Sequence, residues 1–519
     1  MTDSNPSTSL NNPPPPTSRF PPELLVKIFE CLVTNSNPAI LLQICHRWAD
    51  IASSVSALWS RIDFSTRPEP LLQRCAHQPI DIILLSSHAV PTHRQRRAAR
   101  DVLFHYNDRI RKLVLDLLAS HLQSMEPEIW GPFPILVDVS ISVWRNRPRP
   151  GALRFPEWKP TTTSPSPIRY FKLLRVYTPW VLGRFQNLVE FFLHDQPRGP
   201  DPPMEVFLGI LESSPQLTVL SVVNAGPRLP LGSTTLPPAR RVIHLHNLEH
   251  LYLDQGEGFD IGWMLIHLHI PVSTKVRIYL DIIYSVPPVV FLDSAFELAL
   301  PNHPGFPHLT NLHRCTYAVD HQPSCVITAP NFAFKIIWHG SRHFDGLMTP
   351  FLRRVMAVGM IEDFTIIHHQ PWTYDDSILQ WDEIFGTLHS LQTLRVNQLP
   401  GKVDLSIWAV FQSQPSPALR ELRLSFLMFD EESQGEEGGE NRKELARSLV
   451  DYCAERNRRG YPLERLVIEA PINLPSGLPS LLAPHVGYFE VREEVLSDGD
   501  IQAPEFGSRR VFDSIRAGR

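Results

Sequence analysis

Apolar residues recur at helical spacing in one dense segment near the start of the chain, between residues 20 and 64. The first series follows two prolines suited to the first turn of a helix, and it consists of Leu24, Leu25, Ile28, Phe29 and Leu32. The second series follows Asn37 and Pro38, residues typical of a helix start, and consists of Leu41, Leu42, Ile44, Cys45 and Trp48. The third consists of Ile51, Ala52, Val55, Leu58 and Trp59. The spacing predicts three helices.

The apolar stripe on the first predicted helix is wider than a single neighbouring helix requires. Leu24 and Ile28 lie on one side, and Leu25 and Phe29 lie about 100° around the helix axis from them. A unit of about 45 residues is also close to the lower size limit for independent folding. We therefore expect a second surface to cover part of the stripe. That surface belongs either to another protein or to the rest of this chain.

From about residue 100 onward the hydrophobic pattern changes to short alternations of the form apolar-x-x-apolar-x-apolar. Clear copies start at Ile110, Leu136, Ile168, Leu188, Leu217, Leu248, Ile361, Leu391, Leu419, Leu463 and Val486. Weaker copies lie near Val276, Leu309 and Ala333. The starts are about 29 residues apart on average, a period typical of repeats that each add one strand to a stack. The pattern therefore predicts a long array of strands.

Within each copy, the residues that alternate with the last two apolar positions are expected to face outward. In a stacked array these outward residues share one face of a sheet, which we take as the candidate substrate-binding face. Its members are Tyr252, Asp254, Arg395, Asn397, Arg423, Ser425, Val467 and Glu469. A mixture of aromatic and charged groups suits a protein or peptide ligand. The alternative is an ordinary solvated face that binds nothing.

Three polar stretches set the boundaries of the predicted domains. Residues 1–18 are mostly Ser, Thr, Asn and Pro, and residues 497–519 carry few apolar groups, so we expect both to be disordered tails. The acidic run 430–444 falls in the longest interval between two copies and is expected to be a solvated loop. The predicted order is a tail at 1–18, a helical module at 19–64, the strand array at 65–496 and a tail at 497–519.

Composition narrows the function classes. Lys and Arg number 49 against 54 Asp and Glu, a net charge of −5 that argues against a general nucleic-acid binder. Proline, with 50 of 519 residues, blocks helix interiors and favours many short elements of a mixed α/β class. No apolar run reaches the roughly 18 residues of a membrane span, so we expect no membrane association. The six cysteines contain no C-x-x-C pair, which favours a reducing compartment, cytoplasm or nucleus.

Motifs for catalysis and metal binding are weak or missing. The sequence contains no phosphate-binding glycine loop, no H-E-x-x-H and no G-x-S-x-G, so we expect neither an enzyme nor a bound cofactor. His244 and His246 form an H-x-H pair, but no cysteine or carboxylate cluster completes a set of zinc ligands, and we expect no metal. The run 92–100 is locally basic and fits an amphipathic helix with solvated arginines. The acidic total and the lack of interleaved aromatic residues argue against a phosphate or nucleic-acid role for it.

The residue order of the first segment resembles a known family. It reads F-P-P-E-L-L-V-K-I-F, then I-C-H-R-W and a closing A-L-W, and in this order it resembles the F-box, with Phe20 in place of the family's usual leucine. The matching residues are Phe20, Pro21, Glu23, Leu24, Leu25, Ile28, Phe29, Leu32, Ile44, Cys45, Arg47, Trp48, Leu58 and Trp59. The resemblance implies a module that binds the Skp-type adaptor of cullin-based ubiquitin ligases. The adaptor-binding residues it implies are Phe20, Pro21, Glu23, Leu24, Leu25, Ile28, Phe29, Leu32, Cys45 and Trp48.

The whole chain resembles the fungal F-box proteins that carry a C-terminal leucine-rich-repeat-like domain. The strand signature is that of leucine-rich repeats, but the Asn or Cys that usually follows the third apolar position is mostly missing. Gly256 and Leu427 stand there in two of the copies. We therefore expect an irregular leucine-rich-repeat-like solenoid after the F-box.

These resemblances imply a substrate-recognition subunit of an SCF-type ubiquitin ligase. The F-box would dock on the Skp-type adaptor and, through it, on a cullin. The repeat domain would hold a protein substrate for ubiquitin-dependent degradation. The alternative is a repeat-based protein-interaction scaffold that acts outside a ubiquitin ligase.

Overall fold

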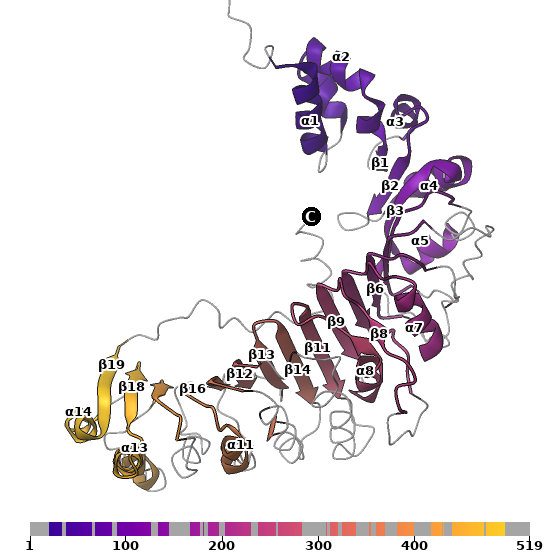
Figure 1. The fold of residues 1–519 in the computed structure, drawn as a ribbon. Helices are drawn as coiled ribbons and strands as arrows, with labels where there is room; N and C mark the ends of the chain where they lie inside the picture. The colour runs from indigo at the N-terminus through magenta and orange to yellow at the C-terminus, as the bar shows by residue number, and fades with distance from the viewer. Residues whose placement is uncertain are drawn as a thin grey trace, which may run out of the picture. The chain divides into compact units, whose positions relative to one another are not determined.

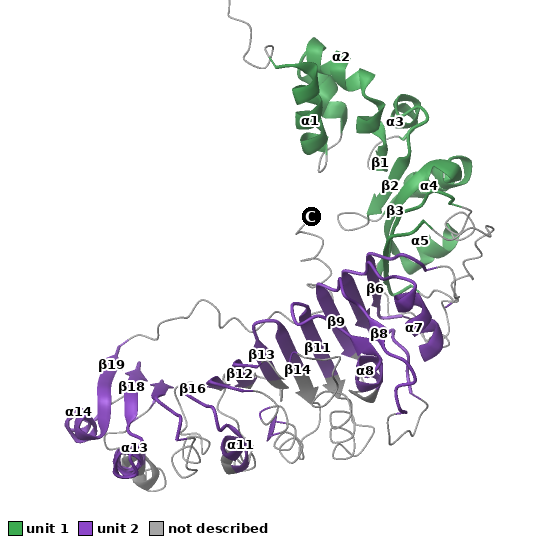
Figure 2. Ribbon diagram, viewed as in Figure 1, with its two compact units in different colours: residues 1–179 green, residues 180–519 purple. Residues whose placement is uncertain are grey.

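The computed structural model describes the N-terminal helices and most of the predicted strands. The described residues are 20–33, 38–64, 68–85, 91–125, 133–144, 167–176, 180, 185–196, 203–229, 237–255, 258–282, 308, 312–319, 324–338, 352–353, 356, 360–368, 381–398, 417–427, 429, 439–471 and 474–493. Both predicted tails and residues 430–438 of the acidic run lie outside them. The chain divides into two compact units, residues 1–179 and 180–519 (Figure 2).

Four short helices form the N-terminal module, where the sequence predicted three. They are α1 (Pro22–Val33), η2 (Pro38–Gln43), α2 (His46–Ser54) and η3 (Ser56–Trp59) (Figure 1). The first helix and the helix start at Pro38 are confirmed. The predicted extent of the second helix is wrong, because Cys45 adopts an extended conformation with φ −163° and ψ 163° between η2 and α2. The third apolar series is consequently divided between α2 and η3.

The N-terminal module has a core of its own. Its fully buried side chains are Leu25, Phe29, Leu41, Ala52, Leu58 and Trp59. The rings of Phe29 and Trp48 lie 4.7 Å apart between centroids. The Trp59 indole donates a 2.8 Å hydrogen bond to the Ala52 carbonyl, which satisfies the one polar atom that its burial removes from water.

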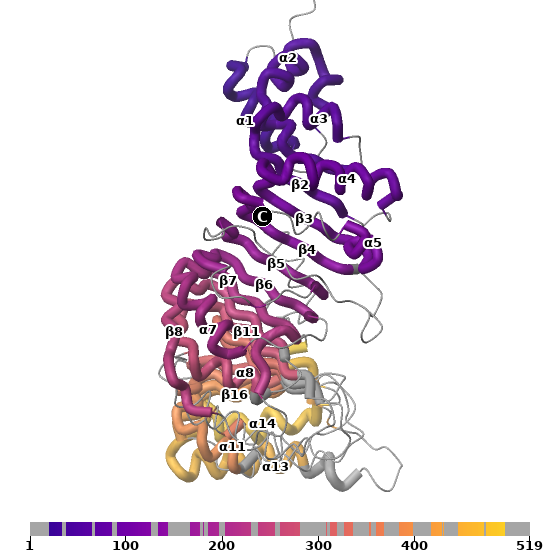
Figure 3. Tube along the Cα trace, turned by 90° about the vertical axis from the view of Figure 1, so that its right-hand side faces the viewer, coloured from indigo at the N-terminus to yellow at the C-terminus, as the bar shows by residue number. Residues whose placement is uncertain are grey.

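Five parallel strands follow in the first unit, each paired with the one before it in the sequence. They are β1 (Arg61–Asp63), β2 (Ile80–Leu85), β3 (Ile110–Leu118), β4 (Asp138–Trp144) and β5 (Tyr170–Leu174). Figure 3 shows β2 to β5 side by side in this order. The helices α3 (Glu69–Arg74), α4 (His93–His105) and α5 (Ala119–Ser124) lie in the connections between strands.

The second unit continues the same scheme with strands β6 (Glu190–His194), β7 (Val219–Val223), β9 (His250–Gln255) and β11 (Lys275–Ile282), which pair in parallel. Its last five strands also pair in parallel and in sequence order. They are β15 (Asp363–His368), β16 (Thr393–Gln398), β17 (Glu421–Ser425), β18 (Leu463–Glu469) and β19 (Val486–Arg492). A separate pair of short strands consists of β8 (Ile243–His244) and β10 (Leu268–His269).

All the clear copies of the apolar pattern coincide with strands, so this prediction is confirmed. The large parallel sheet fits a solenoid-like arrangement in a mixed α/β fold. Two of the weaker copies also lie in strands, Val276 in β11 and Ala333 in β14 (Phe332–Trp338). The third, at Leu309, lies outside the described residues.

Three strands between β11 and β15 form an antiparallel meander in reverse order, where the sequence predicted consecutive parallel repeats. β14 pairs with β11, β13 (Ser324–Ala329) pairs antiparallel with β14, and β12 (Arg314–Val319) joins β13 to β15. The prediction was wrong here because antiparallel strands show the same alternation of apolar and polar residues as parallel ones.

The sheet of the second unit has an apolar face under helices and a polar face opposite. Leu394, Leu422 and Leu466 occupy matching positions on β16, β17 and β18, and all three are fully buried. The helices α11 (Trp381–Thr387), α13 (Gly439–Arg458) and α14 (Leu478–Leu482) lie along one side of these strands (Figure 1). Residues 439–444 of the acidic run open α13 and are therefore not a loop, in keeping with the helix-forming residues that follow Gly439.

A left-handed residue directly follows several strands at the same position of the pattern. Asp195, Asn224, Phe426 and Ala470 have φ between 45° and 58°. Each of their amides donates a hydrogen bond to a carbonyl at the end of the next strand, on its last residue or, for Asn224, on its next-to-last residue, with N···O distances of 2.7 to 2.9 Å. This recurring step links each of these strand ends to the neighbouring strand.

The second unit also contains the helices α7 (Met204–Glu212) and α8 (Gly258–Leu265). None of the helices in the described part of the chain combines the length and hydrophobicity that crossing a bilayer requires.

Candidate functional site

The apolar stripe of α1 divides into a buried flank and an exposed flank. Leu25 and Phe29 are fully buried within the chain itself. Leu24, Ile28 and Leu32 remain 48%, 38% and 45% exposed. They are spaced by four residues, so they share one face of the helix. The chain's own body therefore covers one flank and leaves the other open.

Two further apolar side chains of the same module are exposed. Ile40 of η2 and Ile44, which follows it, are both more than half exposed. We call the set Leu24, Ile28, Leu32, Ile40 and Ile44 the apolar stripe. Isolated exposed apolar residues are ordinary, whereas a group of this kind on one small module marks a contact surface.

The remaining residues of the predicted adaptor surface lie around the stripe or under it. Phe20, Pro21, Glu23 and Cys45 are exposed, and Trp48 is half-buried against Phe29. The Pro21 carbonyl accepts hydrogen bonds from the amides of Leu24 and Leu25 and so begins the helix. The predicted adaptor residues included neither Ile40 nor Ile44, although Ile44 was part of the second apolar series.

One arginine fixes the chain where it enters α1. The Arg47 guanidinium on α2 donates a 2.5 Å hydrogen bond to the carbonyl of Phe20. The contact ties the residue before the helix to the second helix of the module. It orients Phe20, whose side chain is 41% exposed, beside the start of α1.

The second candidate surface is the polar face of the sheet in the second unit. Arg395, Arg423 and Val467 occupy matching positions on neighbouring strands, as the repeat pattern predicted. Asn397, Ser425 and Glu469 form the next row. Val467, Ser425 and Glu469 are buried, however, so only part of this predicted substrate face is accessible.

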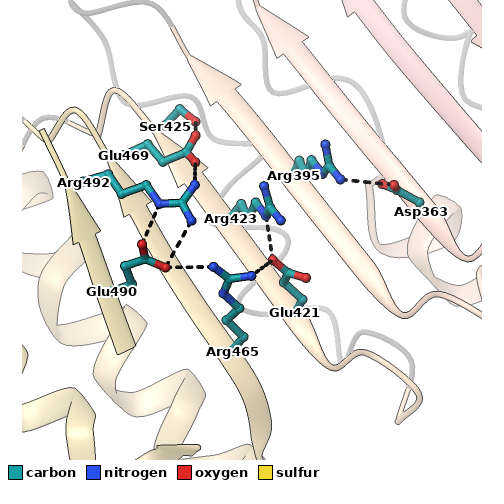
Figure 4. A network of polar contacts seen from close by, with 9 residues as sticks. All are labelled: Asp363, Arg395, Glu421, Arg423, Ser425, Arg465, Glu469, Glu490 and Arg492. Atoms are coloured by element: carbon teal, nitrogen blue, oxygen red, sulfur yellow. Dashed lines mark hydrogen bonds and ion pairs between the residues drawn. The ribbon is translucent and has the colours of Figure 1, made fainter. Parts of the chain in front are cut away.

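Arginine–carboxylate pairs cover the end of this polar face at β17 to β19 (Figure 4). Glu490 accepts hydrogen bonds from Arg492 at 2.7 Å and from Arg465 at 2.8 Å. These two guanidinium groups lower the pKa of Glu490 to about 2, with the Arg492 hydrogen bond as the largest cause. Arg465 also lies 3.6 Å from Glu421 on β17, so the pairs join three strands.

The same network continues along the strands in both directions. Ser425 donates a hydrogen bond to Glu469 at 3.0 Å or to Asn397 at 2.9 Å, and Arg492 lies 3.2 Å from Glu469. Two further pairs, Arg423–Glu421 at 2.6 Å and Arg395–Asp363 at 3.4 Å, complete it. Charges of opposite sign are thus matched within the network itself.

Tyr252 and Asp254 lie on the polar face as predicted, but both are buried. The Tyr252 hydroxyl lies 3.4 Å from a carboxylate oxygen of Asp254. Burial, followed by the charge of Asp254, raises the pKa of Tyr252 above its ordinary value. Nearby, His194 lies 2.7 Å from the Ser221 hydroxyl, and its burial lowers the pKa of the imidazole to about 4. These side chains build the sheet and offer little surface to a ligand.

The two histidines singled out from the sequence, His244 and His246, lie close to a third, His269. The ring of His244 lies 4.7 Å from that of His269 and 5.6 Å from that of His246. Within the described residues, no three histidine, cysteine or acidic side chains are arranged to hold a metal ion. Burial also raises the pKa of Cys315 and of Cys453 to about 12, so neither thiol is an activated nucleophile.

One family model, F-box-like, matches residues 17–65, the region that contains the four helices. The chain therefore carries an F-box-like domain at its N-terminal end. No curated protein is detectably similar to this chain.

Proposed function

We propose that this protein is a substrate-recognition subunit of a cullin-based, SCF-type ubiquitin ligase. The F-box-like domain binds a Skp-type adaptor, and the strand array holds a protein target. The observation that carries the proposal is the open apolar stripe on a module whose own core is complete.

The stripe has the energetics of a docking surface. Burying the exposed parts of Leu24, Ile28 and Leu32 contributes about 1 kcal/mol each before the costs of association. Leu25 and Phe29 support this face from beneath, because the same helix carries both flanks. The predicted contact residues thus fall into a layer that touches the adaptor and a layer that holds the first in place.

In this function the protein acts by proximity. It makes and breaks no bonds itself and brings its target close to the ubiquitin-conjugating partner. The matched polar face of the sheet supports a role in holding a protein surface, since such faces bind through shape and hydrogen bonds with moderate charge. We expect no cofactor.

A binding measurement with matched variants tests the adaptor surface. Replacing Leu24 and Ile28 with aspartate places two carboxylates in the contact, where they lose water. We expect the affinity for a purified Skp-type adaptor to fall at least about 100-fold in isothermal titration calorimetry. Circular dichroism establishes that the variant is folded.

Leu481→Asp provides the control, because Leu481 on α14 is 58% exposed and belongs to the other unit. It should bind the adaptor as the unaltered protein does. Full adaptor binding by the folded double variant would refute the mapped surface. Co-purification of a cullin with the tagged protein separates ligase membership from the scaffold alternative.

A further inference from the structure

A basic groove on α4 is unconnected with the F-box surface. Its volume is about 510 Å³, and its lining residues are His93, Arg96, Arg97, Arg100, Asp101, Phe104 and Ser124. Most of them come from α4, whose thirteen residues carry four arginines and one aspartate. This concentration of positive charge contrasts with the net charge of −5 of the whole chain.

The groove lies on one face of α4, away from the core. His93, Arg97, Arg100 and Phe104 follow one another at intervals of three or four residues, so they form a line along the helix. Ala99, Val102 and Leu103 are buried on the other side. The arginines therefore point where a partner can reach them without disturbing the fold.

The start of α4 is fixed firmly. The Thr92 hydroxyl accepts a hydrogen bond from the Gln95 amide, and the Gln95 side chain accepts one from the Thr92 amide. The Gln95 side-chain nitrogen also donates to the carbonyl of Phe64 at 2.8 Å. A ligand in the groove thus meets a helix that is already in place, which lowers the ordering cost of binding.

The positive charges of the groove repel one another. Arginines three and four residues apart on a helix repel one another, and Asp101 is the carboxylate among the lining residues in the described part of the chain. Arg96 is held by the Pro91 carbonyl at 2.5 Å and lies 3.1 Å from the ring nitrogen of His121. The pKa of His121 is lowered, first by burial and then by the charge of Arg96.

An apolar ring closes one end of the groove. Phe104 is 66% exposed, and its ring meets His105 edge-on with 5.0 Å between centroids. A large exposed aromatic beside guanidinium groups is typical of surfaces that bind a peptide with acidic and apolar residues. Nucleic acid is a poorer fit, because binding it requires a longer basic track with several aromatic rings.

We propose that the α4 groove binds an acidic peptide segment of a partner protein, with anionic groups on Arg96, Arg97 and Arg100 and an apolar side chain on Phe104. Carboxylates and phosphates both present the paired oxygens that a guanidinium recognises. The proposal does not depend on the proposed ligase function, since no residue of the apolar stripe takes part.

Fluorescence anisotropy with the full chain tests the proposal. The probe is a labelled peptide with four glutamates around one leucine. Arg97→Glu with Arg100→Glu should weaken its binding at least about tenfold, because charge-assisted contacts become repulsive. Phe104→Ser should weaken it less, and added salt should weaken it in the unaltered protein.

Arg94→Glu is the matched control, because Arg94 is exposed on the same helix but does not line the groove. It should bind the probe nearly as the unaltered protein does. Equal losses for Arg94→Glu and the double variant, or equal binding of a peptide with glutamine in place of glutamate, would overturn the proposal. A phosphoserine version of the peptide shows which anion is preferred.

Discussion

Adjacent residues of α1 take opposite roles. Leu24 faces outward and Leu25 faces the core, and the same holds for Ile28 and Phe29. The sequence predicted the helix and the width of its apolar stripe. It could not decide which flank the chain itself covers, because both flanks carry similar side chains and the covering residues of η2 and η3 come from later in the chain.

Truncation of the two flanks should therefore have very different effects on stability. Phe29→Ala leaves a cavity in the module's core and should lower the free energy of unfolding by about 3–5 kcal/mol. Ile28→Ala removes a half-exposed side chain and should cost less than about 1 kcal/mol. Urea unfolding followed by intrinsic tryptophan fluorescence measures both. Equal costs would show that the two flanks are not distinct.

The left-handed residues after the strands are another feature that the sequence did not show. Asp and Asn, which tolerate this conformation, occupy two of the positions, but Phe426 and Ala470 occupy others, so no residue type marks the step. The left-handed conformation accompanies the backbone hydrogen bond to the next strand. That bond is a contact between residues far apart in the sequence.

Ala470→Gly should raise the free energy of unfolding by about 1 kcal/mol, because glycine adopts a positive φ without the cost that a β-carbon brings. Gly460, with φ 88°, allows the opposite substitution at a position of positive φ. Gly460→Ala should lower the free energy of unfolding by about the same amount. The midpoints of thermal unfolding should shift in opposite directions. A shift of the same sign in both variants would contradict the assigned backbone conformations.

At the scale of elements, the strands were the most predictable part of the molecule. The alternation of apolar and polar residues follows from the geometry of a strand, so each clear copy could be located in advance. Strand direction was not predictable, which is why the meander of β12, β13 and β14 was missed. The break at Cys45 was also missed, because the apolar spacing continues across it.

The arginine–carboxylate network on β17 to β19 makes the stability of the second unit depend on pH. The pKa of Glu490 is about 2 in the folded protein, below its ordinary value of 4.5, so the unfolded chain takes up the proton first. The contribution of Glu490 is complete above about pH 4.5 and is lost as the pH falls toward 2. Glu490→Gln should flatten the dependence of the unfolding midpoint on pH in this window.

Glu464→Gln is the control for this measurement. Glu464 lies on β18, and its side chain is 65% exposed in an ion pair with Arg420. Exposed pairs contribute little, so this variant should retain the acid sensitivity of the unaltered protein. The network is not the source of the acid sensitivity if Glu490→Gln and Glu464→Gln behave alike.

At the scale of the whole molecule, the chain combines three surfaces of different chemistry. The F-box-like domain offers an apolar stripe, α4 offers a basic groove, and the sheet of the second unit offers a face whose charges are matched internally. The first was predicted from the resemblance of its residue order to a family, and the outward positions of the sheet were predicted from the repeat pattern. The basic run of α4 was visible in the sequence, but its groove was not predicted as a site.

The number of strands in the meander explains why the strands on either side of it run in the same direction. Three strands is an odd number, so β14 beside β11 and β12 beside β15 run in the same direction, and β15 is parallel to β11. With an even number of strands in the meander, every later strand would run in the opposite direction. The connections would then emerge at the opposite edge of the sheet. Parity therefore makes this segment a self-contained cassette, one whose gain or loss leaves the polarity of all downstream repeats intact.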